Sequence, residues 1–237
     1  MKSWQEDLLK AVEHATSEDG LFVQVQHAAA CLGFEHCAYG LRLPLPLSNP
    51  CTVLLNNYPR GWHERYEAAN YIAVDPTVQH ARRSQAPLVW NDAMFESTRE
   101  LWDEAQMHGL KFGWAQSARD ANGIAGMLTL SRSGDPITSQ ELEHNEIKMR
   151  WLVNVSHLGL SRLLAPKLGW DDQLALTKRE VEVLKWTADG KTSGEISDLL
   201  SVSENTVNFH VRNAVSKLQS ANRTAAVVRA AMLGLLN

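Results

Sequence analysis

The C-terminal quarter of the chain constrains the fold most strongly, because it carries two helix-capping signals in close succession. Thr177 with Glu180, and Thr192 with Glu195, are T-x-x-E capping boxes. In such a box each side chain satisfies a backbone N–H at the start of a helix. Apolar residues recur at helical spacing behind each box. The segment therefore predicts two helices, the second ending at residues 201–203.

A third helix is predicted after a turn of about three residues, which is the helix-turn-helix spacing. Val207, Val211, Ala214 and Leu218 fall at i, i+4, i+7 and i+11 along it, so they face inward. A fourth helix follows Asn222, which is suited to cap it. The pattern predicts a four-helix unit in which one polar face of the third helix is directed outward.

That outward face carries the residue types that contact double-stranded DNA. Asn bridges an adenine edge, Arg reaches guanine or phosphate, and Phe lies against a thymine methyl. The residues assigned to DNA contact are Asn205, Thr206, Asn208, Phe209, Arg212, Lys217 and Lys191. The alternative is a packed bundle whose polar face is only solvated, since short helix-turn-helix patterns also arise by chance.

The charge is divided unevenly along the chain. The net charge of the whole chain is −4. Residues 174–237 carry eight Lys and Arg against six Asp and Glu, whereas residues 1–173 carry 15 against 21. The basic part is therefore the part assigned to DNA.

Length, cysteine usage and hydropathy favour a two-domain cytoplasmic protein. A chain of 237 residues, 44% of them hydrophobic, is long enough for more than one domain. Its three cysteines contain no C-x-x-C pair and cannot all be paired, which favours reduced thiols. No uncharged apolar run of 18 residues and no secretory leader is present, so neither membrane insertion nor export is expected.

The first part of the chain alternates between helical and strand periodicity. The Asn122-Gly123 pair is a strong signal for a hairpin between two strands. The predicted elements are helices over 4–15 and 16–33, strands over 36–43 and 52–56, helices over 62–69, 76–83 and 101–108, strands over 112–119 and 124–132, and a long helix over 138–163. Together they predict an α+β chain: an N-terminal α/β/α sandwich on an antiparallel sheet, followed by the helix-turn-helix unit.

The predicted boundaries follow from a break in composition after the long helix. Pro166, Gly169 and two acidic residues interrupt the helical pattern there. We expect a ligand-binding domain over residues 1–165, a linker over 166–173 and a DNA-binding domain over 174–237.

Aromatic and polar side chains are concentrated in residues 58–90. Small-molecule pockets are apolar and aromatic with a few directed polar groups. Tyr hydroxyls, Trp indole N–H groups and the carboxylate of Asp75 predict a ligand with carbonyl acceptors and an amide donor. Two structural alternatives remain open. Trp62 and Tyr66 are also spaced as a core-facing helix would require, and Asp75 before Pro76 is a typical helix N-cap.

The two halves together resemble one known family. The run L-T-x-R-E-x-E-V-L-x-W-T-A-x-G-K-T-x-x-E-I, followed by S-E-x-T-V-N-F-H-V, is similar to LuxR-type transcription regulators. Glu180, Leu184 and Gly190 match hallmark positions of that DNA-binding domain. The family's Y-x-x-x-W-x-x-x-Y, D-P, P-x-x-W and G-x-x-x-G stretches are matched between residues 58 and 113. The resemblance covers nearly the entire chain and is nearest to the QscR and CepR type.

The resemblance implies that the first domain binds an N-acyl homoserine lactone. By position, Trp62 donates to the lactone carbonyl, and Tyr58 and Thr129 hydrogen-bond the acyl carbonyl. Asp75 accepts the amide N–H, and Trp90 packs on the lactone ring. The ligand-binding residues implied in this way are Tyr58, Trp62, Tyr66, Asp75, Trp90, Trp102, Gly113, Thr129 and Ala38.

The implied function is a quorum-sensing regulator that binds inverted-repeat promoter DNA as a homodimer, with RNA polymerase as a further candidate partner. No cofactor, metal or catalytic residue is expected. Two alternative functions are an output protein of a phosphorelay and a lactone-modifying enzyme. A receiver needs acidic residues and a phosphoacceptor Asp in a parallel α/β domain, and the chain lacks metal-hydrolase, nucleophile-elbow and phosphate-loop motifs.

Overall fold

The computed structural model of the protein describes residues 3–170 and 175–236. These residues divide into two compact units. The first is built from the chain up to Leu168 except residues 44–50 and 121–123, which group with the second unit, built mainly from Gly169 onward. Residues 171–173 of the expected linker lie outside the described residues.

The first unit is built on a five-stranded sheet in the order β2-β1-β5-β4-β3, and every neighbouring pair is antiparallel. Its strands are β1 (His36–Arg42), β2 (Thr52–Asn56), β3 (Leu88–Val89), β4 (Phe112–Arg119) and β5 (Ala125–Arg132). The predicted hairpin joins β4 to β5, with Gly123 in the left-handed region at φ +77°. Strand β3 was not predicted, because a two-residue strand is too short to show a period of two.

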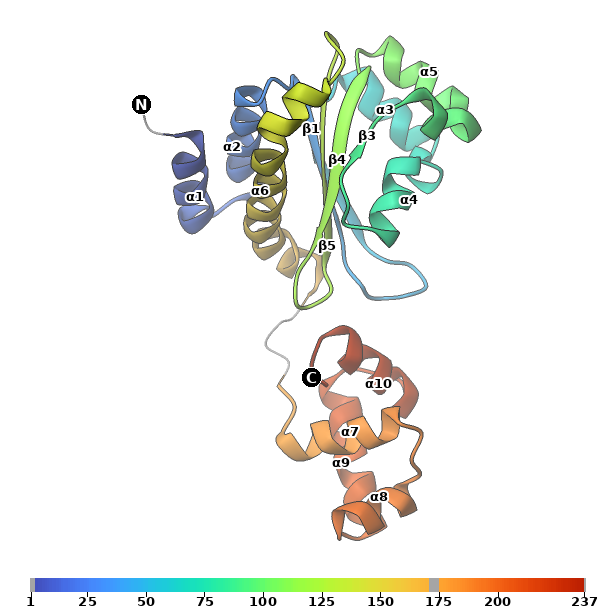
Figure 1. Cartoon of the computed structure of the whole chain (residues 1–237). Helices are drawn as coiled ribbons and strands as arrows, with labels where there is room; N and C mark the ends of the chain where they lie inside the picture. Colours follow the sequence, from blue (N-terminus) through green and yellow to red (C-terminus); the bar gives the residue numbers. More distant parts are fainter. Residues whose placement is uncertain (1–2, 171–174, 237) are drawn as a thin grey trace. The chain divides into compact units, whose positions relative to one another are not determined.

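Helices cover both faces of this sheet, which confirms the predicted α/β/α sandwich (Figure 1). One face carries α1 (Trp4–His14), α2 (Glu18–Cys31) and α6 (Ser139–Leu164), and the other carries α3 (Arg60–Ala68), α4 (Pro76–Arg83) and α5 (Arg99–Met107). Three 3-10 helices, η1 (Tyr71–Ala73), η2 (Asp92–Thr98) and η3 (Pro166–Leu168), complete the unit. Helix α2 begins later than the predicted start at residue 16, because Ser17 is its cap and accepts a hydrogen bond from the Gly20 N–H.

The two faces of the sheet are covered in different ways. Helix α6 is 26 residues long and buries Leu152 and Leu160 completely against fully buried Trp114 and Leu128 of the sheet. The opposite face is covered by three short helices of eight or nine residues. The long helix therefore packs the main core, and the short helices leave room for a cavity.

The second unit contains the four predicted helices: α7 (Lys178–Ala188), α8 (Ser193–Leu200), α9 (Glu204–Lys217) and α10 (Arg223–Met232). Both capping boxes are formed, and Ser203 and Asn222 cap the last two helices. Ser201 ends α8 in the left-handed conformation at φ +52°. The four residues predicted to face inward on α9 are all buried.

A buried carboxylate links the first and third helices of this unit. Glu180 is only 3% exposed, and its Oε2 accepts hydrogen bonds from the Thr177 N–H at 2.7 Å and from Lys217 Nζ at 2.8 Å. Burial alone would raise the pKa of Glu180, but the hydrogen bonds from Lys217 and Thr177 outweigh it and leave the pKa below its ordinary value. The capping box thus also anchors the end of α9.

We expect Glu180→Gln to destabilise the second unit by about 1–3 kcal/mol. The substitution removes the buried carboxylate of an ion pair, and the loss is limited because the Lys217 ammonium is partly exposed and screened by solvent. Because the folded pKa is lowered, this stabilisation is present above the ordinary pKa of Glu and is lost as pH falls through the folded pKa. Hydrogen exchange of peptides from residues 175–236 in the full chain measures the loss.

The matched control is Glu182→Gln, since Glu182 pairs with Arg179 at the surface. Equal protection of the Glu180→Gln and Glu182→Gln proteins at neutral pH would show that the buried pair contributes nothing.

Candidate functional site

A cavity of about 140 Å³ lies in the first unit between the sheet and the short helices. Eight of the nine residues predicted to bind a ligand line it: Ala38, Tyr58, Trp62, Tyr66, Asp75, Trp90, Trp102 and Thr129. Strand pairing explains part of this set, since Ala38 of β1 is directly opposite Thr129 of β5 and both project from the same face. The rest come from the β2–α3 connection, α3, the start of α4, the end of β3 and α5.

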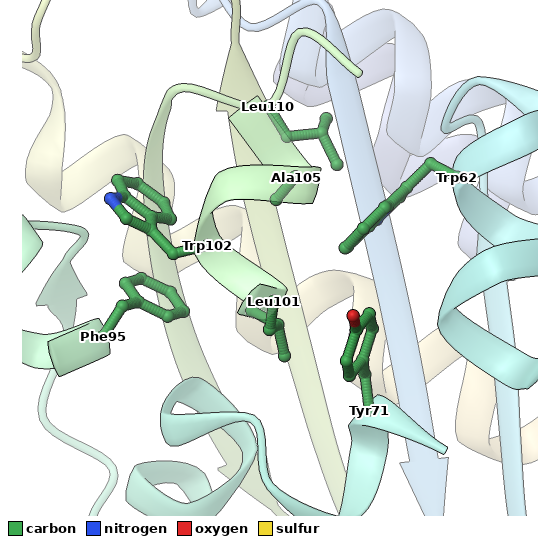
Figure 2. Close-up of a cluster of buried hydrophobic side chains, with 7 residues drawn as sticks. All are labelled: Trp62, Tyr71, Phe95, Leu101, Trp102, Ala105 and Leu110. Carbon is green, nitrogen blue, oxygen red and sulfur yellow. The ribbon is translucent and has the colours of Figure 1, made fainter. Parts of the chain in front are cut away.

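One end of the cavity is aromatic (Figure 2). Trp62 stacks on Tyr71 with ring centroids 5.9 Å apart, and Phe95 stacks on Trp102 at 4.3 Å with an interplanar angle of 7°. Leu101, Ala105 and Leu110 fill the space between these two pairs. Such pairs are worth about 0.5–1.5 kcal/mol beyond the area they bury. The aromatic walls are therefore held in place by the core itself.

The indole and hydroxyl groups of the site differ in whether the protein satisfies them. The Trp102 indole N–H donates to Asp92 Oδ1 at 2.6 Å. Neither the Trp62 indole N–H nor the Thr129 hydroxyl is hydrogen-bonded to another described residue, although both residues are buried and line the cavity. Buried polar groups normally have partners, so these two are suited to a polar group of a ligand.

Asp75 has a structural role and also faces the cavity. Its Oδ1 accepts from the Thr77 N–H at 2.8 Å and from the Thr77 hydroxyl at 2.6 Å, so it caps α4 as predicted. Its Oδ2 accepts from the Tyr66 hydroxyl at 2.9 Å. Burial raises the pKa of Asp75, and the hydrogen bonds from Thr77 and Tyr66 only partly offset that rise. The two interpretations left open by the sequence, cap and ligand contact, are thus compatible.

An ion-pair network on the outer side holds α3 to α5. The Arg65 guanidinium donates to both carboxylate oxygens of Glu104, at 2.7 and 2.9 Å, and the Tyr71 hydroxyl donates to Glu104 at 2.8 Å. Bidentate pairs of this kind fix geometry as well as adding energy. The network positions Trp62, which lies on α3 and stacks on Tyr71.

Gly113 is the predicted ligand residue that does not line the cavity. A Cβ at this position would lie 2.2 Å from the Trp90 ring, so the glycine lets the indole lie flat against strand β4. Its role here is to make space for Trp90. The G-x-x-x-G resemblance identified an important position but not the reason for it.

Sequence analysis missed several residues around the cavity. Thr77, Ile72, Val78, Leu54, Met127, Arg42, Arg82 and Arg119 all line it. Ser131, two residues beyond Thr129 on the same face, is fully buried. The period-2 pattern of β5 and the D-P-T cap were the signals that could have identified Met127, Ser131 and Thr77.

The residues predicted to contact DNA fall into two groups on the second unit. Asn205, Phe209 and Arg212 are exposed on α9, and Phe209 is 52% exposed. The others have partners within the unit. Asn208 accepts from Ser193, Thr206 is bonded to Ser203, Lys217 pairs with Glu180, and Lys191 lies 3.9 Å from Glu195. The exposed group is the one open to an incoming duplex.

The described residues offer neither a metal site nor a membrane span. No cluster of three or more His, Cys, Asp or Glu among them could hold a metal ion. No helix in the described part of the chain has the length and apolarity needed to cross a bilayer. The chemical class of the candidate ligand therefore follows from the cavity and its hydrogen-bonding groups.

Two family models match the chain in the order of its two units. The autoinducer binding domain matches residues 17–160, and the model of bacterial regulatory proteins of the luxR family matches residues 174–230. The transcriptional activator AnoR of Acinetobacter nosocomialis is 46% identical over all of both chains. The transcriptional activator SolR of Ralstonia nicotianae is 42% identical over 98% of each.

The chain belongs to the LuxR family of bacterial regulatory proteins. It is accordingly an autoinducer-responsive, DNA-binding quorum-sensing transcription regulator and not an enzyme. The narrower expectation of closeness to the QscR and CepR type is not supported, since the relatives at 46 and 42% identity are AnoR and SolR.

Solved structures agree with this family assignment. The crystal structure of Escherichia coli SdiA has a TM-score of 0.83 and 35% identity over 99% of this chain and 98% of SdiA. SdiA in complex with octanoyl-rac-glycerol gives a TM-score of 0.82 at 34% identity, over 100% of this chain and 99% of SdiA. The fold of the two units is thus shared with a relative of the same length.

Proposed function

We propose that the cavity of the first unit binds an N-acyl homoserine lactone and that the ligand controls a dimer bound to promoter DNA. The observation that carries the ligand class is the set of groups around the cavity: two unsatisfied donors, on Trp62 and Thr129, and one carboxylate acceptor, on Asp75. A lactone carbonyl and an acyl carbonyl need donors, and an amide N–H needs an acceptor. The aromatic end provides a wall for the lactone ring.

The contacts proposed are those implied by the family resemblance. Trp62 donates to the lactone carbonyl, and Tyr58 and Thr129 hydrogen-bond the acyl carbonyl. Asp75 accepts the amide N–H, and Trp90 packs on the ring. Tyr66 acts through Asp75, which it holds by a 2.9 Å hydrogen bond. The complex of SdiA with octanoyl-rac-glycerol supports an acyl ligand for this type of cavity.

The remaining boundaries and partners are proposed on the same basis. We place the ligand-binding domain at residues 1–165, the linker at 166–173 and the DNA-binding domain at 174–237. The protein works in the cytoplasm, and RNA polymerase is a candidate partner of the DNA-bound form.

A dimer is supported by the exposed side of α6, where Ile147 is 80% and Leu158 is 65% exposed around half-buried Trp151.

We expect Asp75→Asn to weaken lactone binding by about 10- to 150-fold, because losing a hydrogen bond to a charged group costs about 1.5–3 kcal/mol. Titration calorimetry of the full chain with N-acyl homoserine lactones of graded chain length measures the change. Asn still accepts from the Thr77 N–H, so the cap of α4 is retained.

The matched control is Asp103→Asn on α5, an exposed carboxylate that pairs with Arg99. Unchanged affinity in the Asp75→Asn protein, with the control also unchanged, would contradict the assignment of the amide acceptor.

The DNA part of the proposal rests on Arg212, the exposed cation in the middle of the outward face of α9. One recognition helix gives few base contacts, so we propose a dimer on an inverted repeat with half-site centres about 34–36 Å apart. If Arg212 donates two hydrogen bonds to one guanine, Arg212→Ala weakens the binding free energy by about 1–3 kcal/mol per half-site. It also relaxes the base preference at one symmetric position of the DNA site.

Selection of binding sites from randomised DNA compares the wild type with Arg212→Ala, and Lys185→Ala on the exposed side of α7 is the control. If Arg212 is a phosphate contact instead, binding weakens uniformly and the salt dependence falls by about one unit per half-site. Recovery of single, unpaired half-sites by the wild type would refute the dimer.

A further inference from the structure

Three arginines lie at the end of the cavity opposite its aromatic end. Arg42 of β1 and Arg119 of β4 are each paired with Ala125 of β5, so the two arginines flank a small residue in one line across the sheet. Arg82, from the last turn of α4, lies over the same end. All three arginines line the cavity.

These guanidinium groups have no acidic partner within the part of the chain that the structure describes. None of the three forms an ion pair or hydrogen bond with a described residue. Burial, and then the charges of Arg82 and Arg119, lower the pKa of Arg42. Like charges gathered without a counter-charge form an attractive site for an anion.

A second cavity adjoins this end. It has a volume of about 110 Å³ and shares Arg82, Arg119 and Ala125 with the first. Its other lining residues are largely polar and include Arg83, Ser84, Gln85 and Ser117. The arginine end therefore combines cationic groups with additional hydrogen-bonding groups, whereas the aromatic end is closed by Trp and Phe rings.

The middle of the cavity is suited to a hydrocarbon chain. Ala38 and Arg42 are four residues apart on β1, which corresponds to about 13 Å at roughly 3.3 Å per residue. Between them the lining is apolar or small, with Gly40, Leu54, Val78 and Met127. The C–C bonds of an extended hydrocarbon chain are about 1.5 Å long, and because the chain zigzags each bond advances it by less than that length. A chain of roughly ten bonds therefore covers this distance.

We propose that the arginine end of the cavity binds the carboxylate of a medium-chain fatty acid whose hydrocarbon chain lies in the same cavity, pointing toward Trp62. This inference rests on the proposed function, because it assigns a second ligand class to the cavity given to the lactone. Guanidinium groups match the planar geometry of a carboxylate. The fatty acid and the lactone occupy the same space, so each excludes the other.

The test compares decanoate, kept below its micelle-forming concentration, with its uncharged methyl ester, kept below its solubility limit, in calorimetric titrations of the full chain. We expect decanoate to bind at least roughly tenfold more tightly than the ester, since hydrogen bonds to charged groups are the stronger ones. Decanoate should also displace N-decanoyl homoserine lactone competitively.

Variants identify the residues. R42Q together with R119Q should weaken decanoate binding by roughly tenfold or more and lactone binding by less than about threefold, because only the carboxylate needs the charges. R119Q alone replaces an exposed guanidinium. If the double variant fails to fold, R119Q should still weaken decanoate binding more than lactone binding. The control is R60Q, at an arginine on α3 that is 91% exposed and pairs with Glu64.

Equal binding of decanoate and its ester, or equal decanoate affinity in the wild type, R119Q and R60Q proteins, would overturn the inference. Binding of the lactone in the same preparation separates the two proposals. If the lactone binds and decanoate does not, only the fatty-acid site fails. If no lactone binds, the proposed function fails as well.

Discussion

The Asp75 carboxylate is the interaction on which the ligand-binding unit depends. It caps α4 through two hydrogen bonds from Thr77 and receives the Tyr66 hydroxyl from α3. One carboxylate therefore fixes the start of one helix, the side of another and the wall of the cavity between them. Its desolvation raises its pKa, and the three donors around it oppose that rise. A ligand amide would be a further donor to the same group.

The cavity follows from the way the two faces of the sheet are covered. A single long helix packs closely on one face, while on the other α3 and α5 meet at aromatic rings rather than along a continuous ridge. The Arg65–Glu104 pair holds α3 against α5 from outside, so the space between helices and sheet does not depend on contacts inside it. Close packing is the general state of protein interiors, and a persistent cavity needs this kind of external support.

The sequence predicted the elements of this chain well, because most of its helices carry their own caps. The boxes at Thr177 and Thr192, and the cap at Asp75, mark helix starts to the residue. Strand β3 lacked such a signal, since its position is set by pairing with β4. The 3-10 segment η2 does begin at a cap, Asn91, but it is too short for a helical period to show. The arginine cluster could not be predicted either. Arg42, Arg82 and Arg119 are far apart in sequence and come together only through the register of the sheet and the direction of α4.

The central claim is that the first unit is a receptor for acyl homoserine lactones, and thermal unfolding of the full chain tests it most directly. A ligand that binds only the folded state stabilises it by about 2.7 kcal/mol at one hundred times its Kd. We predict that saturating N-acyl homoserine lactone of matching chain length raises the melting temperature by several degrees, whereas the ring-opened acyl homoserine does not. Identical melting curves with and without lactones across the range of acyl lengths would contradict the account.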